Sequence, residues 1–284
     1  MRWMTGLLAL MVACDGSTDT DATDATDATD TTDTGDYTVP TDDPTTDGVD
    51  RSAALGGRIV DADGNPIEGV RIRFCLSTVC RNGSSNAAGE ILDSLDNVGF
   101  DDVEVDQHAF EVRPPLEDEG TIAVGYVPLV FETDQTRDVT ITLPTLDPAT
   151  PIPGASTQVE IGSGLFVTLG PSDLTPPLFE DEATQVAGVQ VGADDFPPVD
   201  FDGGTVIAMW YLDPFDHVAE AGLPVSFTNS WGLAEGATYE VWQGSYKEQA
   251  WLERGTVTVN GGTLSGDATL GLLSTTVLVE PAAE

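Results

Sequence analysis

Residues 57–74 read GRIVDADGNPIEGVRIRF, and this stretch decides the fold. A short run rich in strand-forming residues, Gly57–Val60, is followed by a cluster of turn-forming residues. Within that cluster Gly64 tolerates a positive φ angle and Pro66 fixes its own φ angle. Apolar and polar residues then alternate through 70–74, as in a strand with one buried face. The stretch therefore predicts two strands joined by a tight turn.

The same pattern of short strands and turns continues along the chain, with no stretch of helical period. A Pro-rich segment, 145–154, reads as a linker between two modules, and Asn260-Gly261-Gly262 predicts a hairpin. The sequence thus predicts an all-β protein with two β-sandwich domains, 54–144 and 155–284. We expect strands at 57–60, 70–75, 102–105, 110–112, 121–124, 138–143, 158–161, 165–169, 186–191, 205–212, 225–228, 238–242, 255–259, 268–272 and 275–279.

The first module resembles carboxypeptidase regulatory-like domains. The resemblance is carried by the spacing of Gly57, Val60, Gly64, Pro66, Ile67, Gly69 and Val70, and by Asn86–Glu90, Gly125–Pro128 and Val139–Leu143. It implies a seven-stranded, prealbumin-like sandwich that serves as an accessory module without an active site. The second module is similar to the sandwich modules of netrin receptors and ankyrins, which implies an interaction or structural role. That similarity is carried by Tyr211–Pro214, Gly222–Val225, Gly232–Gly236 and Trp251 ahead of Gly255.

The N-terminus predicts export and lipidation. Residues 1–13 have the layout of a signal peptide and are too short to span a bilayer permanently. Met11–Cys14 resembles the bacterial lipobox, which implies acylation of Cys14 and a lipid anchor in the cell envelope, in either the inner or the outer membrane. Residues 14–53 then read as a disordered tether, because 15–50 hold 12 Asp and no Lys, Arg or Glu.

The charge of the chain limits the partners that it can bind, and its cysteines indicate the compartment in which it folds. The whole chain carries a net charge of −39, and residues 51–284 hold nine bases and 37 acids, a net charge of −28. Such a surface repels nucleic acid and anionic lipid, so the acylated Cys14 must supply the attachment to the bilayer. Cys75 and Cys80 predict a local disulfide, as suits an oxidising compartment.

Aromatic residues suggest a ligand surface in the second module. If Tyr239 and Val241 face inward, strand alternation turns Trp242 outward. We therefore name Trp231, Trp242 and Tyr246 as the candidate glycan-binding residues, while noting that large aromatic side chains also fill sandwich cores.

Acidic residues suggest a second candidate site. Four aspartates around an irregular loop could clamp Ca²⁺, or could simply be solvated: Asp194, Asp195, Asp200 and Asp202. No other cofactor is expected. His108-x-x-Glu111 with a distant His217 imitates a zinc site, but alternation along a strand predicts opposite faces for His108 and Glu111.

The chain holds two His, no Ser/His/Asp order and no phosphate-binding Gly-rich loop, so we do not expect an enzyme. The leading interpretation is a non-catalytic envelope lipoprotein whose two β-modules have a structural or recognition role. One alternative is a glycan- or Ca²⁺-dependent adhesive module. The other is a secreted glycosidase, which requires two carboxylates in one cleft.

Overall fold

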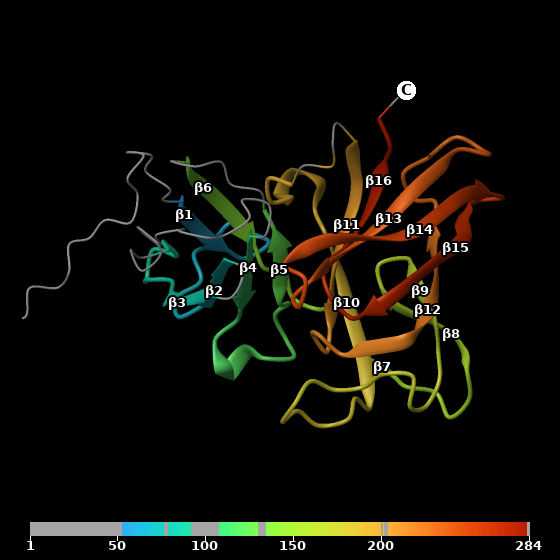
Figure 1. Ribbon diagram of the computed structural model, residues 1–284, viewed down its shortest axis with the longest axis horizontal. Coiled ribbons are helices and arrows are strands. Elements are labelled where there is room, and N and C mark those ends of the chain that lie inside the picture. The colour runs from blue at the N-terminus through green and yellow to red at the C-terminus, as the bar shows by residue number, and fades with distance from the viewer. Residues whose placement is uncertain are drawn as a thin grey trace, which may run out of the picture. The chain divides into compact units, whose positions relative to one another are not determined.

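The computed structural model describes residues 53–76, 79–91, 108–129, 135–199, 201 and 204–282. The predicted signal peptide, Cys14, nearly all of the tether and the predicted strand 102–105 lie outside the described residues. Within them the chain forms sixteen strands and two short 3-10 helices, so the predicted all-β class is confirmed (Figure 1). None of the described helices could cross a membrane.

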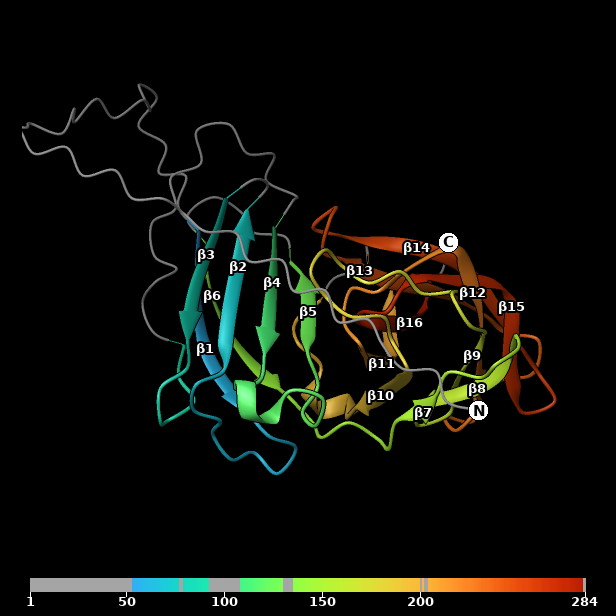
Figure 2. The same cartoon turned by 90° about the horizontal axis from the view of Figure 1, so that it is seen from below.

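The first module consists of two facing sheets (Figure 2). One sheet pairs β1 (Ala53–Val60) in parallel with β6 (Gln135–Thr142). The other has the order β3-β2-β4-β5, with β2 (Arg71–Leu76), β3 (Val79–Ser84), β4 (His108–Arg113) and β5 (Gly125–Pro128). Side chains from both sheets meet in one core that includes Ile59, Ile72, Phe74, Phe110 and Ile141.

The turn after β1 forms as its sequence predicts. The Asp61 carboxylate accepts hydrogen bonds from the backbone N–H groups of Asp63 and Asn65, and Gly64 has a φ of 80°. The N–H of Ile67 then donates to the carbonyl of Ile59, so the chain folds back along β1. The Asp61 side chain, by accepting from backbone N–H groups two and four residues further on, thus stabilises the turn that follows β1.

The second module is a ten-stranded sheet in the order β7-β10-β11-β16-β13-β14-β15-β12-β9-β8. The sheet curls so that β10 lies against β8, and it encloses a second core of residues such as Trp210, Phe227 and Leu278. The strands are β7 (Thr150–Pro151), β8 (Thr157–Gly162), β9 (Leu165–Leu169), β10 (Gln185–Val191), β11 (Thr205–Asp213), β12 (Val218–Thr228), β13 (Thr238–Ser245), β14 (Ala250–Asn260), β15 (Thr263–Leu272) and β16 (Thr276–Glu280).

The predicted hairpin joins β14 to β15. Asn260 pairs with Thr263 across a two-residue loop, and Gly261 and Gly262 have φ angles of 59° and 86°. Two consecutive positive φ angles are what a type I′ turn requires, and glycine adopts them without steric cost.

One predicted strand is displaced. Residues 121–124 do not form the expected strand, because the N–H groups of Thr121 and Ile122 bond back to Asp118 after the 3-10 helix η1 (Leu116–Asp118). The strand β5 begins instead at Gly125, where the sequence indicated a turn, and all four of its residues are buried. Burial on both faces arises because β5 lies at the junction of the two modules, with Gly125 against the Tyr211 ring.

The first core extends into the second module. Val189, Met209, Tyr211 and Val277 belong to the same cluster as Ile59 and the other buried residues of the first module. Within the predicted linker, β7 pairs with β10. The exact boundary at 145–154 stays a prediction. The described residues form one compact unit. We call the junction at which these four residues pack against the core of the first module the seam.

Candidate functional site

A cavity of about 340 Å³ lies at the seam, between the outer face of β2 and β4 and the loops of the second module. Three of the ten Lys and Arg residues of the chain line it. In a protein with a net charge of −39, this gathering of bases is exceptional. The lining residues are Arg71, Arg73, Arg113, Pro177, Glu180, Phe215, Asp216 and Tyr246.

Strand alternation and register bring the three arginines together. Since Ile72 faces the core, its neighbours Arg71 and Arg73 point to the other face of the sheet. Arg113 pairs directly opposite Arg71, on the adjacent strand β4. Like charges in that position destabilise a sheet, so carboxylates are needed beside them.

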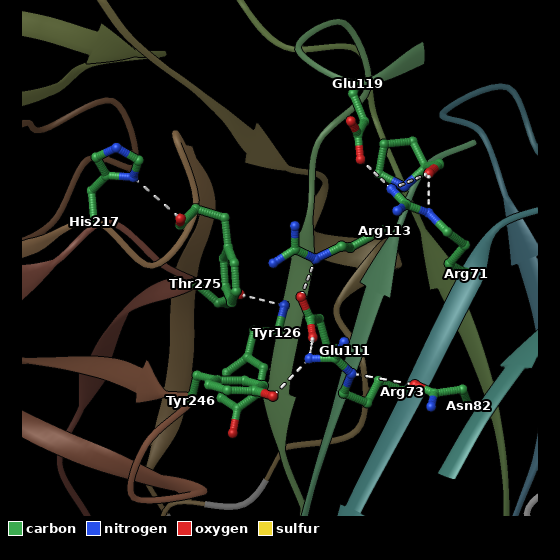
Figure 3. A network of polar contacts seen from close by, with 12 residues as sticks. Arg71, Arg73, Asn82, Glu111, Arg113, Glu119, Tyr126, His217, Tyr246 and Thr275 are labelled. Carbon is green, nitrogen blue, oxygen red and sulfur yellow. Dashed lines mark hydrogen bonds and ion pairs between the residues drawn. The ribbon is translucent and has the colours of Figure 1, made fainter. Parts of the chain in front are cut away.

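Glu111 is the central carboxylate of this group. Its side chain is 2% exposed, and it lies opposite Arg73 in the register of β2 and β4. It accepts a hydrogen bond from Nε of Arg113, and its Oε2 lies 3.5 Å from Nη1 of Arg73 (Figure 3). Burial alone would lower the pKa of Arg113, but Glu111, together with Glu180 and Glu119, outweighs burial and the pKa is raised. Glu111 therefore holds two charged guanidinium groups in place.

Arg73 joins the basic wall to the aromatic side chains of the second module. Its Nη1 donates to the Tyr246 hydroxyl at 2.7 Å, and its Nε donates to Oδ1 of Asn82 at 3.3 Å. The Tyr246 ring packs edge-on against Tyr126, with 5.7 Å between ring centroids. Tyr246, which comes from the second module, is thus held at the edge of the cavity by two residues of the first module.

The other two arginines, Arg71 and Arg113, differ in which of their N–H groups already donate a hydrogen bond. Arg71 donates to the carbonyl of Pro114 and to Glu119. Arg113 lies 5.3 Å from the centre of the Phe215 ring. Its terminal amino groups have no hydrogen-bond partner among the described residues and carry no contact in Figure 3. These donors remain available to a ligand.

The opposite wall of the cavity is acidic. Glu180 comes from the loop between β9 and β10, and Asp216 from the loop between β11 and β12. Burial and the nearby Glu111 raise the pKa of Asp216 to about 6, while Arg113 lowers it. Among the described residues, no ion pair joins either acid to an arginine of the basic wall. The two walls therefore face each other across the cavity without a direct ion pair, although the charges of Arg113, Glu180 and Asp216 act on one another through space.

The predicted aromatic set is distributed over three clusters. Trp231 packs edge-on against Trp210 beside the second core, at 5.8 Å between ring centroids. Trp242 packs against the first core, with 5.5 Å between its ring centroid and that of Phe201. Tyr239, on the same strand, is buried. Of the three named residues, Tyr246 lines the seam cavity. Their role in glycan binding stays a prediction.

The predicted Ca²⁺ site is partly described. Asp194 and Asp195 lie in the 3-10 helix η2 (Ala193–Asp195), and Asp195 accepts a hydrogen bond from the Thr142 hydroxyl at 3.2 Å. Asp200 and Asp202 lie outside the described residues. Where the chain is described, no group of three His, Cys, Asp or Glu side chains could hold a metal ion. The Ca²⁺ site remains a prediction.

The predicted disulfide forms, and two residues of the zinc-like pattern, Glu111 and His217, contact other groups of the protein. Cys75 and Cys80 form the predicted disulfide, with 2.04 Å between the sulfur atoms, at paired positions of β2 and β3. Glu111, which the zinc-like pattern contains, is engaged with arginines. The buried His217 has its ring nitrogens near the carbonyls of Phe215 and Asp181, at 3.4 and 3.3 Å.

Comparisons with known proteins add little. No family model matches the chain, and no curated protein matches it. Among solved structures, the chain is similar to a "putative carbohydrate binding protein" from Bacteroides uniformis, with 9% sequence identity, over 82% of this chain and 80% of that one. The TM-score is 0.23, so this likeness carries no argument about fold or ligand.

Proposed function

We propose that this chain is a non-catalytic, lipid-anchored protein of the bacterial cell envelope that binds a saccharide in the seam cavity. An acylated Cys14 would anchor it, and the Asp-rich segment 15–50 would act as the spacer. One observation carries the binding proposal: beside the Tyr246 and Phe215 rings, a wall of arginines faces the carboxylates of Glu180 and Asp216 and, among the described residues, forms no ion pair with them.

A sugar suits both walls at once. A hydroxyl group both donates and accepts hydrogen bonds, so it can accept from Arg113 and donate to Asp216 or Glu180. The apolar face of a sugar ring can pack on an aromatic side chain, and the half-buried Tyr246 offers one at the cavity edge, whereas Phe215 is only 5% exposed. A strongly anionic ligand would be repelled by the acidic wall, and a strongly cationic one by the basic wall. A neutral, polyhydroxylated ligand avoids both penalties.

The proposal can be tested on the full chain in detergent. The probes are immobilised oligosaccharides of glucose, galactose, mannose and N-acetylglucosamine, together with envelope polysaccharide from the cells that produce the protein. Arg73→Met should weaken binding at least about tenfold, because it removes one charge of the basic wall and the hydrogen bond that holds Tyr246 at the cavity edge. Arg58→Met is the matched control, since Arg58 is exposed on β1 and bonds to the backbone of Ala88. Its binding should equal that of the unmodified chain.

Two results would reject the proposal: no binding to any probe by the unmodified chain, or equal binding by Arg73→Met. A melting curve for each variant separates lost binding from lost folding. Repeating the measurement with a chelator tests the predicted Ca²⁺ dependence separately.

A second function is favoured by one observation. Glu180 and Asp216 line the same cavity, and the pKa of Asp216 is raised to about 6 by burial and by Glu111, and lowered by Arg113. A carboxyl group whose pKa is raised toward neutral pH can act as a general acid, and a glycosidase uses two carboxyl groups in one cleft. Release of reducing ends from the bound oligosaccharides would support a hydrolase. Its loss in Asp216→Asn and Glu180→Gln would assign the roles, and no release would leave binding alone.

A further inference from the structure

The turn Pro177–Glu180 presents two large apolar side chains to solvent. Leu178 is 82% exposed and Phe179 is 97% exposed, the latter the highest value among the exposed large hydrophobic residues of the described chain. The turn is closed by a hydrogen bond from the N–H of Glu180 to the carbonyl of Pro177, at 3.1 Å. It stands between β9 and β10, in the loop that provides the acidic wall.

The backbone at Phe179 does not favour this residue. Phe179 is the third residue of the turn and has a φ of 73°, where glycine is normally found. A bulky residue with positive φ raises the free energy of the folded state, and an almost fully exposed ring gains no burial to offset it. Folding stability therefore gives no reason for a phenylalanine here.

The position of the ring suggests a reason. Pro177 and Glu180, the first and last residues of the turn, both line the seam cavity. Phe179 directly precedes Glu180, so their Cα atoms are about 3.8 Å apart. Phe179 thus stands between two cavity-lining residues of the same turn, at the rim of the cavity in which a sugar ring is proposed to bind.

We propose that Phe179 is a second sugar-binding subsite, so that the ligand is an oligosaccharide chain rather than a single sugar. This inference rests on the proposed function. One sugar ring occupies the cavity beside Tyr246 and Phe215, and the next stacks on the exposed face of Phe179. Because the Phe179 ring is already exposed, a sugar ring can stack on it directly. Such stacking explains why the side chain is presented to solvent.

A bilayer is a poorer occupant of the same surface. Phe179 is followed immediately by Glu180, Asp181 and Glu182, and the chain as a whole carries a net charge of −39. Anionic headgroups would be repelled from these carboxylates. A neutral sugar chain tolerates them, because its hydroxyl groups can donate to them.

The test compares Phe179→Gly with the unmodified full chain, in detergent, on a monosaccharide and a tetrasaccharide of the sugar that the protein binds. Removing the ring should weaken tetrasaccharide binding about fivefold or more and leave monosaccharide binding unchanged. Because glycine accepts the positive φ, the variant should melt about 2 °C higher. A residue retained for stability would shift the melting temperature in the opposite direction.

Leu178→Ala is the matched control, since it changes the other exposed side chain of the same turn. Unchanged tetrasaccharide binding in Phe179→Gly would overturn the second subsite while cavity binding stands. An equal loss in Leu178→Ala would also overturn ring stacking, as would a Phe179-dependent association with phosphatidylcholine vesicles. If the unmodified chain binds no saccharide of either length, the proposed function itself fails, and the subsite fails with it.

Discussion

The aromatic residues of the closed second core and those of the seam have different neighbours. Trp210 is fully buried, packs 5.0 Å from Phe227 and is surrounded by Leu, Val and Ala side chains. At the seam, Tyr246 and Phe215 lie under the guanidinium groups of Arg73 and Arg113. The same residue types fill space where their neighbours are apolar, and form a candidate binding surface where their neighbours are charged.

The first prediction, which has the largest expected effect, compares the free energies of unfolding of variants in the two regions. Trp210→Ala should lower the free energy of unfolding by about 4 kcal/mol, because it removes a large buried ring and leaves a cavity. Tyr246→Ala should cost less than about 2 kcal/mol, since that ring lies at the edge of a solvent-accessible cavity. Urea unfolding followed by circular dichroism measures both. Equal losses would show that the seam ring is core packing like Trp210, and would weaken its assignment to a binding site.

The sequence predicts the closed core better than the seam. Tyr239 and Val241 are buried, which is the condition under which alternation turns Trp242 outward, and the Gly261-Gly262 pair correctly marks a hairpin. These features depend on a residue and its near neighbours in the chain, which a sequence pattern contains. Trp242 faces away from Val241 as predicted, but Phe201 and the first core cover part of it. That contact depends on the other module, so alternation alone does not predict it.

The seam cavity was missed for the same reason. Alternation through 70–74 places Arg71 and Arg73 on the face of the strand opposite its buried one, and it does not show what lies against that face. Their convergence with Arg113 depends on the register of β2 and β4, and with Tyr246 on the contact between modules. The alternating Arg-x-Arg in β2 and Glu-x-Arg in β4 are a usable signal, but only once the two strands are paired.

The second prediction concerns the carboxylate that holds the basic wall. Glu111→Gln should lower the free energy of unfolding by about 3 kcal/mol, because it leaves two guanidinium groups without their buried partner. Glu119→Gln is the control, since Glu119 pairs with Arg71 but is 46% exposed, and it should cost less than about 1 kcal/mol. Thermal and urea unfolding measure both variants. Similar small losses would mean that Glu111 does not organise the basic wall.

The smallest expected effect concerns pH at the acidic wall. The pKa of Asp216 is about 6 in the folded protein, above its ordinary value of 3.8, because of burial and Glu111, with Arg113 acting in the opposite direction. Between these two values the folded state binds the proton more tightly than the unfolded state, so stability from this group falls as pH rises from about 4 through about 6. Partial exposure reduces the effect to about 1 kcal/mol.

Asp216→Asn removes this titration and should therefore be more stable than the unmodified chain at pH 7.5, by about that amount, and nearly equally stable at about pH 3.5, below the ordinary pKa of 3.8. The difference between the two proteins is the quantity to follow, because it cancels the many other carboxylates that titrate in both. Urea midpoints at a series of pH values give it directly. A difference that stays constant across the series would mean that Asp216 is ionised normally, and that the acidic wall is open to water rather than shaped by the seam.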